Sequence, residues 1–368
     1  MVDRENGQKK ALIAMSGGVD SSVAAYLMQA LGWDCIGVTM KLFQNEDVGI
    51  SRAHTCCALE DVEDARGVAR KLGIPHYVFN FSDRFRQCVM DRFVGAYENG
   101  LTPNPCIDCN RFLKFDKLYQ RARELGCEAV ATGHYARIGY DEASGRFLLK
   151  KALDGEKDQS YVLYAMTQAQ LASTVFPLGA LKKQEVRNIA EGQGFLNAHK
   201  HDSQDICFVP NGKYAEFIQG YTGKQYPEGD FVDREGNVLG QHRGMIHYTI
   251  GQRRGLGLSF GRPMYVCEMD PDQNTVTLGP EEALYVKTLY ARDVNLISVP
   301  EMRGEVRLKA KVRYGQKEQP AAVTQTAQDQ IKIEFLEPQR AVTRGQAVVL
   351  YDGDVVVGGG TIDAVQRL

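Results

Sequence analysis

The chain has 368 residues, of which 43% are hydrophobic, and its 44 Lys and Arg against 46 Asp and Glu give a net charge of −2. This composition is typical of a folded globular protein of two to three domains, and it excludes a disordered chain, a fibrous chain and a uniformly basic nucleic-acid binder. No apolar run approaches the roughly 18 residues that a membrane helix needs, and residues 1–10 are too polar for a signal peptide. We therefore expect a cytoplasmic protein without a membrane partner.

Short apolar runs alternate with helical patterns through about the first 200 residues. The apolar runs predict strands at 11–15, 35–40, 75–81 and 128–132. Apolar residues at helical spacing predict helices at 20–31, 59–72 and 111–125. Strands that alternate with helices in this way are typical of a parallel sheet covered by helices on both faces. We therefore expect an α/β domain over residues 1–210.

The pattern changes after this domain. Residues 211–282 are rich in Gly and Tyr and form short runs bounded by turns, which predicts a small central domain. Beyond them the helical period disappears, and residues 305–315 and 330–336 alternate between apolar and polar side chains. This alternation predicts an all-β, barrel-like C-terminal domain over residues 283–368.

The strand at 11–15 runs into the sequence S-G-G-V-D-S-S at 16–22, which opens the first helix. Consecutive glycines let backbone N–H groups approach an anion closely, the helix N-terminus adds partial positive charge, and the serines add hydroxyl donors. The loop has neither the G-K-[ST] of a Walker loop nor the pattern G-x-G-x-x-G. A glycine-rich turn capped by Ser or Asp is the alternative, but the whole motif after an apolar strand favours a phosphate site.

The loop resembles the pyrophosphate-binding loop of the PP-loop ATPases, which cleave ATP between the α and β phosphates and adenylate an oxygen of their substrate. The resemblance implies that ATP also lies next to Met40 and Gly133, which end two further predicted strands, where open parallel sheets bind ligands. The implied ATP-binding residues are Ala14, Met15, Ser16, Gly17, Gly18, Val19, Asp20, Ser21, Met40 and Gly133. ATP chemistry also implies Mg²⁺, for which the sequence identifies no ligands.

The nine cysteines do not suggest a disulfide scaffold, because the chain has no export signal. Cys106 and Cys109 form a C-x-x-C just before the third predicted helix, and the helix N-terminus together with Arg111 and Lys114 would favour the thiolate of Cys109. Structural cysteines or half of a metal site are the alternatives, but zinc would need a second C-x-x-C or an H-x-x-x-H. The adjacent pair Cys56-Cys57 has no assigned role. We expect the other cysteines to be core residues, namely Cys35, Cys88, Cys127 and Cys267.

Cys207 lies in H-D-S-Q-D-I-C-F-V at 201–209, where its apolar neighbours alone would indicate a core residue. Together with other motifs, however, this segment resembles the tRNA-specific 2-thiouridylases of the MnmA type. The motifs are S-G-G-V-D-S-S, N-P-C-x-x-C-N, A-T-G-H-Y-A at 131–136, K-D-Q-S-Y at 157–161, S-Q-D-I-C-F, and G-M-I-H-Y-T-I-G-Q-R-R-G-L at 244–256. The resemblance runs from residue 11 to the C-terminal strands, with the motifs in the family's order.

This resemblance implies an ATP-dependent tRNA sulfurtransferase. ATP would adenylate O2 of the wobble uridine, because C2 of uracil is a poor electrophile and oxide is a poor leaving group. Sulfur would then replace AMP to give 2-thiouridine, AMP and pyrophosphate. Cys207 would carry the sulfur as a persulfide, which a cysteine desulfurase or a relay protein would supply. Cys109 would be the nucleophile that attacks the Cys207 sulfur and leaves a transient Cys109–Cys207 disulfide.

The sequence departs from part of the family at Cys106, where some members carry an Asp that is a candidate general acid or base. A thiol titrates at about 8.5 and an Asp carboxyl at about 4, so Cys106 is not an equivalent acid–base group. The change raises a rival idea, in which Cys106, Cys109 and Cys207 together hold an iron–sulfur cluster.

Two stretches of the sequence combine many basic residues with few acids. Residues 111–123 hold five basic residues against one acid, and residues 241–267 hold four arginines, no acid and interleaved aromatic side chains. An ordinary solvated face is the alternative, but basic residues can position phosphates and aromatic rings can stack on bases. The family resemblance implies contacts with the target base and the tRNA anticodon stem-loop at Asn104, Pro105, Cys106, His134, Lys157, Asp158, Gln159, Arg313, Tyr314 and Gln346.

Two other functions stay open on the sequence alone. A PP-loop ligase that uses ammonia or an amine on a small substrate would share the loop, but it needs neither paired cysteines nor an RNA-binding extension. An RNA-binding scaffold with a degenerate nucleotide loop would bind tRNA without releasing AMP. The intact loop argues against the scaffold.

Overall fold

The computed structural model describes residues 9–43, 59–200, 206–209 and 212–367, so Cys56 and Cys57 lie outside the described residues. The chain forms two compact units that alternate along the sequence. The first unit comprises Met1–Cys88, Cys106–Pro210 and Asp354–Val356, and the second comprises Val89–Pro105, Asn211–Gly353 and Val357–Leu368. Within the described ranges, no helix has both the length and the apolar character that crossing a membrane requires.

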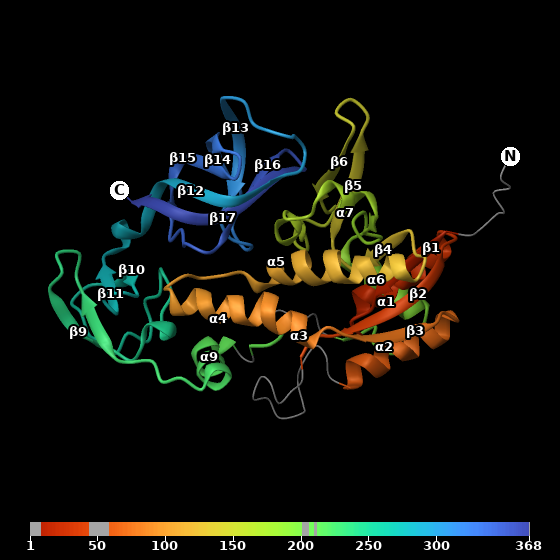
Figure 1. Cartoon of the computed structure of the whole chain (residues 1–368), viewed down its shortest axis with the longest axis horizontal. Coiled ribbons are helices and arrows are strands. Elements are labelled where there is room, and N and C mark those ends of the chain that lie inside the picture. The colour runs from red at the N-terminus through yellow and green to blue at the C-terminus, as the bar shows by residue number, and fades with distance from the viewer. Residues whose placement is uncertain (1–8, 44–58, 201–205, 210–211, 368) are drawn as a thin grey trace. The chain divides into compact units, whose positions relative to one another are not determined.

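The first unit is built on a five-stranded sheet in the order β3-β2-β1-β4-β7, in which neighbouring strands run parallel (Figure 1). Its strands are β1 Lys10–Ala14, β2 Asp34–Lys41, β3 His76–Asn80, β4 Ala129–Thr132 and β7 Thr174–Val175. β1 lies in the middle of the sheet, and its residues Ala11, Leu12 and Ile13 are fully buried. A strand covered on both faces has apolar residues without alternation, which explains the continuous apolar run that predicted it.

Helices cover both faces of this sheet. They are α1 Val19–Ala30, α2 Leu59–Leu72, α8 Lys183–Gly192 and α6 Leu118–Glu124. Ala11 and Ile13 share a core cluster with residues of α1, α2 and α8. Leu12 points to the opposite face, where it packs with Leu118 and Ala122 of α6. The predicted parallel sheet covered by helices on both faces is confirmed.

One predicted helix begins earlier than expected. The sequence pattern placed its start at residue 111, whereas the helical chain begins with α5 Pro105–Cys109, continues as a π-helical stretch over Asn110–Lys117 and ends as α6. Proline is favoured at the first position of a helix, because its fixed φ suits the helix and its missing N–H is not needed there. The polar N-P-C-I-D-C-N motif has no apolar period, so the hydrophobic pattern detects only the later turns.

The remaining elements of the first unit are short. They are α3 Ser82–Phe85, the hairpin β5 Ala136–Asp141 and β6 Arg146–Lys151, the 3₁₀ turn Ser160–Leu163, and α7 Gln168–Ala172. A π-helical stretch, Arg86–Met90, runs from α3 to the first residues of the second unit.

The described residues of the second unit form two α-helices, two short 3₁₀ helices at Met245–His247 and Glu281–Leu284, a four-stranded sheet and a barrel. The α-helices are α4 Asp91–Glu98 and α9 Tyr214–Thr222. Their aromatic side chains pack together, with the ring centres of Tyr97 and Tyr214 at 5.8 Å and those of Phe93 and Phe217 at 6.1 Å. The sheet has the order β10-β11-β8-β9, with β8 Gly229–Val232, β9 Val238–His242, β10 Tyr265–Asp270 and β11 Thr275–Gly279.

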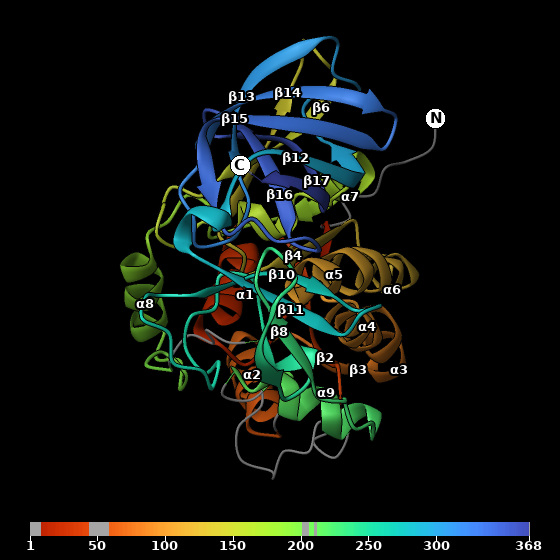
Figure 2. The same ribbon diagram turned by 90° about the vertical axis from the view of Figure 1, so that its left-hand side faces the viewer.

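Six strands of the second unit form a closed barrel (Figure 2). They are β12 Tyr285–Leu296, β13 Glu305–Lys311, β14 Gln319–Ala327, β15 Gln330–Arg340, β16 Ala347–Asp352 and β17 Val355–Arg367. Their order is β12-β15-β14-β13-β16-β17, and β12 also pairs antiparallel with β17, which closes the ring. Ile331, Ile333 and Phe335 lie in its core, as the alternating pattern predicted.

Candidate functional site

The strand order of the first unit creates a switch point between β1 and β4. From β1 the chain proceeds to β2 and then β3 on one side, whereas β4 lies on the other side of β1. In open parallel sheets, ligands bind at such a switch point, beyond the carboxyl ends of the strands. The glycine loop follows the carboxyl end of β1, and Gly133 follows the carboxyl end of β4.

The two glycines beside this crevice are packed too closely to carry side chains. Gly17 has a φ of +77°, and a Cβ on it would lie 2.3 Å from the backbone oxygen of Asp61 in α2. A Cβ on Gly133 would lie 2.8 Å from the backbone nitrogen of Ser21 in α1. The loop therefore meets α2 and the end of β4 through backbone atoms, and it requires glycine at both positions.

The first turn of α1 is open to an anion. Gly18 is the N-cap residue, and no side chain caps the helix. The hydroxyls of Ser21 and Ser22 both donate to the Gly18 carbonyl oxygen, at 2.9 and 3.1 Å. The N–H groups of a first helical turn have no partners inside the helix, and the helix dipole adds positive potential there. Together these features suit the binding of a phosphate, and the phosphate site expected from the sequence stays a prediction.

Asp20 lies in this first turn and is held by two side chains from distant parts of the chain. Nζ of Lys183, at the start of α8, donates to both carboxylate oxygens, at 2.7 and 2.8 Å. The Tyr135 hydroxyl donates to Oδ1 at 2.8 Å. Lys183 lies 163 positions from Asp20 and in no recognisable motif, so the sequence alone does not indicate it. A cation in this place can offset the negative charge of bound phosphates.

The other predicted ATP-binding residues lie along the ends of β1 and β2. Ala14 ends β1, and the buried Met15 donates its N–H to the Val38 carbonyl oxygen at 2.8 Å. Met40, near the end of β2, packs with Ala14 against one apolar cluster. The structure thus gathers the predicted ATP-binding residues at the carboxyl ends of neighbouring strands; their contacts with a nucleotide stay a prediction.

His134 follows Gly133 and is buried with partners on both ring nitrogens. Its Nδ1 lies 2.6 Å from the Thr132 Oγ1, and its Nε2 lies 3.4 Å from Nζ of Lys114. Burial and, to a lesser extent, the Lys114 charge lower the pKa of His134 well below its usual value. The ring is therefore neutral at pH 7. Through Lys114, the helical chain that starts at Pro105 contacts the end of β4.

Cys109 lies inside a helical segment and not in front of one. The sequence predicted a setting that favours the thiolate, and the structure contradicts this. Burial raises the pKa of the Cys109 thiol to about 11, and the charge of Lys114 offsets only part of this effect. The neighbouring Cys106 and Asp108 raise it further. At pH 7 the thiol is protonated in this structure, so nucleophilic attack requires a base or a change of surroundings when substrate binds.

Alkylation of Cys109 by iodoacetamide in the substrate-free protein is expected to accelerate about tenfold for each pH unit from about pH 7 to about pH 10. Below its pKa, the ionised fraction of a thiol rises tenfold per unit of pH, and the thiolate is the reactive form. Peptide mass spectrometry of quenched samples measures this rate separately for Cys109 and for the exposed Cys106. A rate for Cys109 that levels off by about pH 8 would contradict the raised pKa.

The three cysteines that the sequence singled out all belong to the first unit, and the structure has them as reduced thiols. Cys106 is exposed, and Cys207 lies in a turn in which Val209 donates its N–H to the Ile206 carbonyl at 2.9 Å. No three His, Cys, Asp or Glu side chains among the described residues are grouped closely enough to hold a metal ion. The described residues therefore give no support to an iron–sulfur cluster held by these three cysteines. The roles of the three thiols stay predictions.

The predicted tRNA contacts Asp158 and Gln159 take part in a hydrogen-bonded turn. Asp158 accepts two backbone N–H groups, at 3.0 and 3.2 Å, and the Ser160 hydroxyl at 2.8 Å. The Gln159 side chain accepts the backbone N–H of Tyr135 at 2.9 Å. This turn therefore braces the tyrosine that holds Asp20. A contact between tRNA and the segment beginning at Lys157 stays a prediction.

The second unit brings together predicted tRNA contacts that lie far apart in the sequence. Gln346 Nε2 donates to the Pro103 carbonyl oxygen at 3.3 Å. The backbone N–H of Thr102 donates to the Arg344 carbonyl oxygen at 3.0 Å. Gln346 thus lies beside the segment that continues into Asn104 and Pro105, the residues expected near the target base.

Arg313 and Tyr314 are two predicted tRNA contacts in the barrel, and their side chains lie in different surroundings. The Arg313 guanidinium donates to the carbonyl oxygens of Arg340 and Ala341, both at 2.9 Å, and so stabilises the barrel itself. Tyr314 is 43% exposed, and Nζ of Lys311 lies 5.6 Å from its ring centre. An exposed ring next to a cation suits the stacking of an unpaired base.

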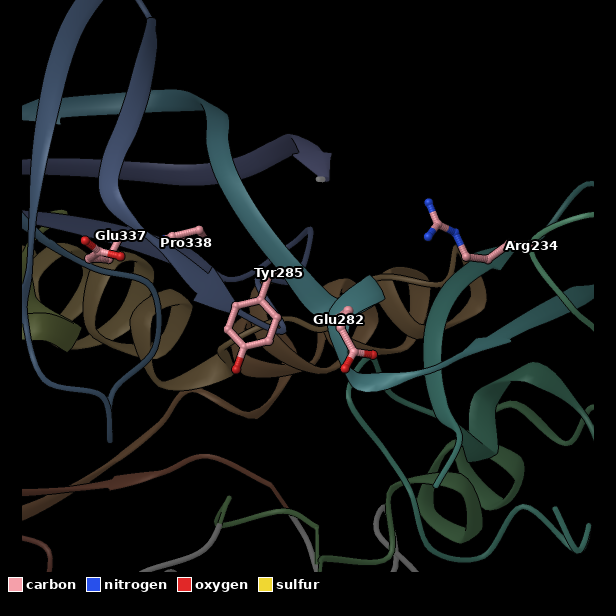
Figure 3. Close-up of a pocket in the computed structure, with 5 residues that line it drawn as sticks. All are labelled: Arg234, Glu282, Tyr285, Glu337 and Pro338. Carbon is pink, nitrogen blue, oxygen red and sulfur yellow. The ribbon is translucent and has the colours of Figure 1, made fainter. Parts of the chain in front are cut away.

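The second unit also has a cavity of about 530 Å³, which Figure 3 shows with its lining residues. The lining residues are Arg234, Glu282, Tyr285, Glu337 and Pro338. One arginine and two glutamates face this space, so its charge indicates no single class of ligand. It contains none of the residues that the sequence predicted for the site.

A glycine loop between a central parallel strand and an uncapped helix, at the switch point of the sheet, defines a nucleotide-binding domain of the PP-loop class. The family models agree with this fold. The tRNA methyl transferase HUP domain matches residues 9–211, the tRNA methyl transferase PRC-barrel domain matches 215–280, and the aminomethyltransferase beta-barrel domain matches 286–362.

The chain is similar over nearly its whole length to proteins named tRNA-specific 2-thiouridylase MnmA. It is 52% identical over 355 residues to the one from Clostridioides difficile (strain 630), which covers 96% of this chain and 98% of the relative. It is 50% identical over 355 residues to the one from Lachnoclostridium phytofermentans, covering 96% and 99%. The chain belongs to the tRNA-specific 2-thiouridylase MnmA family.

A solved complex of a 4-thiouridine synthetase with RNA and bound ATP is a much more distant match. It is 21% identical, covers 58% of this chain and 50% of that chain, and has a TM-score of 0.35. This likeness is too weak to support an argument about function.

Proposed function

We propose that the protein is an ATP-dependent tRNA sulfurtransferase that converts the wobble uridine to 2-thiouridine in the cytoplasm. The observation that carries the proposal is the 52% identity over 96% of the chain to a tRNA-specific 2-thiouridylase. The open first turn of α1 beside Lys183 supports the use of ATP. Neither a ligase for small substrates nor an RNA-binding scaffold has support of this kind.

ATP binds with its phosphates along Ser16–Ser21 and with its nucleoside between Met40 and Gly133. The loop has an open side for this, because a Cβ on Gly18 would meet only the Ser16 hydroxyl within 4 Å, at 3.6 Å. Backbone N–H groups and the dipole of α1 hold the phosphates, and the ammonium of Lys183 offsets their charge. Transfer of AMP to O2 of the uridine then releases pyrophosphate.

Mg²⁺ would accompany ATP and spread the negative charge of the phosphates. Asp20 fits this ion, because it is a carboxylate in the phosphate loop and Mg²⁺ is usually bound by one or two carboxylates together with phosphate oxygens and water. Its present hydrogen bonds to Lys183 and Tyr135 hold the carboxylate ready in the loop. We assign no further ligand.

Sulfur transfer uses two thiols of the first unit. Cys207 carries the incoming sulfur as a persulfide, and that sulfur attacks C2 of the adenylated uridine while AMP leaves with the former carbonyl oxygen. Cys109 attacks Sγ of Cys207, breaks the bond to the transferred sulfur, and forms a Cys109–Cys207 disulfide. Two external thiol groups then reduce this disulfide, become a disulfide themselves and regenerate both cysteines. A variant of this order releases hydrosulfide before the attack on C2.

The expected partner is tRNA, bound by its anticodon stem-loop. The proposed contacts are Asn104, Pro105, Cys106, His134, Lys157, Asp158, Gln159, Arg313, Tyr314 and Gln346. Among them, Tyr314 offers an exposed ring and Gln346 adjoins the segment leading to Asn104. The sulfur comes from a persulfide donor such as a cysteine desulfurase or a relay protein. We also propose domain boundaries at 1–210, 211–282 and 283–368.

Incubation of the protein with unmodified tRNA, ATP and sulfide should yield 2-thiouridine together with one AMP per modified base. Mass spectrometry of the digested nucleosides measures the product, and chromatography measures AMP. Omission of ATP should remove the product, because an unactivated C2 carbonyl does not exchange its oxygen for sulfur. AMP release without any thiolated nucleoside would instead point to a ligase acting on another substrate.

A further inference from the structure

A buried asparagine holds the loop that we assign to the phosphates of ATP. Asn197, in the segment after α8, is 3% exposed. Its Nδ2 donates to the carbonyl oxygen of Gly17 and to the hydroxyl of Ser22, both at 2.9 Å. The Ser22 hydroxyl donates in turn to the Gly18 carbonyl oxygen at 3.1 Å. The Asn197 side chain thus holds the glycine loop at Gly17 and the first turn of α1 at Ser22.

Holding the Gly17 carbonyl also sets the direction of the next N–H group. The peptide between Gly17 and Gly18 is trans, so its carbonyl oxygen and its N–H point in opposite directions. Asn197 binds the carbonyl side, and the Gly18 N–H therefore points away from Asn197. Gly18 borders the open side of the loop and directly precedes the uncapped turn of α1. The amide of Asn197 consequently aims a backbone donor toward the place of a phosphate.

The segment that carries Asn197 is itself fixed to the helix behind the loop. Nζ of Lys200 lies 2.5 Å from an Asp61 oxygen and 2.7 Å from an Asp64 oxygen, both in α2. The backbone of Asp61 is also the surface against which Gly17 packs. Phe195 and Ala198 of the same segment lie in the core cluster shared by α1, α2 and α8. Asn197 is therefore held rigidly relative to the loop.

Asparagine at position 197 has both a stabilising and a destabilising effect, because its amide nitrogen donates to the buried Gly17 carbonyl oxygen while its amide oxygen is left unsatisfied. Its Oδ1 is buried and finds no hydrogen-bond partner among the described residues. An unsatisfied buried acceptor is unfavourable, and an apolar side chain of similar volume would remove it. The benefit of asparagine here lies in its donor group, which reaches the glycine loop.

We propose that Asn197 is a positioning residue for the phosphate loop, and that Lys200 keeps it in place through α2. The proposal rests on the function proposed above, because it concerns the affinity for ATP. It assigns to the segment 195–200 a part in nucleotide binding that no motif of the sequence indicated.

The test measures the equilibrium binding of ATP to the full chain without tRNA. Titration calorimetry gives the dissociation constant for the wild type and for each variant. Asn197→Leu keeps the volume and removes the donor, so the dissociation constant for ATP should rise about ten- to a hundredfold, as expected for loss of a well-oriented bond to a charged group. The melting temperature should fall by about a few degrees at most, because the buried Gly17 carbonyl oxygen loses its donor while the unpaired Asn197 Oδ1 is removed. Lys200→Met should weaken ATP binding by a smaller factor. Saturating ATP should restore most of the AMP-forming rate in both variants.

The matched control is Thr174→Val, which removes a side-chain hydrogen bond of 2.7 Å to the Gln170 carbonyl in the same unit, at the edge strand β7 of the sheet. It should leave ATP binding unchanged. Folded Asn197→Leu and Lys200→Met proteins with wild-type ATP affinity would overturn the inference. If the wild type itself bound no ATP, the proposed function would fail first, so the two failures are distinguishable.

Discussion

Replacing Cys207 by alanine is expected to lower persulfide-dependent thiolation of tRNA by roughly a thousandfold or more, as is usual when a covalent intermediate is removed. The thiol is the proposed carrier of the transferred sulfur, so a protein without it cannot be loaded. The same variant should keep much of its activity with free sulfide, because sulfide bypasses the carrier. Nucleoside mass spectrometry with the two sulfur sources, measured in parallel, gives both results.

Cys109→Ala should give a different signature from Cys207→Ala. Without Cys109 the bond between the Cys207 sulfur and the transferred sulfur is not broken. The Cys207 peptide should therefore stay one sulfur atom heavier when tRNA is absent, and with tRNA and ATP it should accumulate as a covalent disulfide adduct with the target base. Cys88→Ala is the matched control, because it removes another cysteine of the first unit that is buried and has no assigned role. Full persulfide-dependent activity of either site variant would refute the two-thiol mechanism.

The second large effect is expected at Asp20. Asp20→Asn should lower tRNA-dependent AMP formation by about a hundredfold or more while tRNA affinity stays within about twofold. The substitution removes the carboxylate that holds the Lys183 ammonium at 2.7 and 2.8 Å, so the cation that offsets the phosphate charge is no longer fixed in place. AMP formation and tRNA binding are measured separately, by chromatography and by filter binding.

Asp34→Asn is a suitable control for this experiment. Asp34 pairs with Lys10 at 3.8 Å in the same unit, with both side chains about half exposed, and such surface pairs contribute little. The double variant Asp20→Asn with Lys183→Met should lose less than the sum of the two single losses, because the two side chains act as a unit. An equal loss of tRNA binding in Asp20→Asn would contradict its assignment to ATP.

The sheet of the first unit could be predicted because its strands are buried on both faces. Such strands form unbroken apolar runs, as at 11–15, and the helices between them repeat at the helical period. The start of the helix at Pro105 could not be predicted in this way. Its first turns are polar and carry the C-x-x-C motif, so the local pattern and the structure agree only from Arg111 onward.

The site was predicted only in so far as its residues lie in a continuous motif. The loop at 16–22 gives a local signal, since glycines and a helix start follow a strand directly. Lys183 and Asn197 give none, because each lies more than 160 positions from the loop and reaches it only through side-chain hydrogen bonds made in the folded chain. The direction of the pKa shift of Cys109 was predicted wrongly. The sequence shows the charged residues next to Cys109, but it does not show that the thiol is buried in the folded chain.

The alternation of the two units has a practical consequence for dissecting the molecule. Residues 89–105 precede much of the nucleotide-binding unit in sequence but belong to the other one. A fragment ending at residue 210 would contain α4 and lack α9, so Phe93 and Tyr97 would lose the aromatic neighbours that now cover them. Such a truncation would expose aromatic side chains of α4 to solvent and would favour aggregation. A usable fragment needs that stretch excised or its aromatic side chains replaced by polar ones.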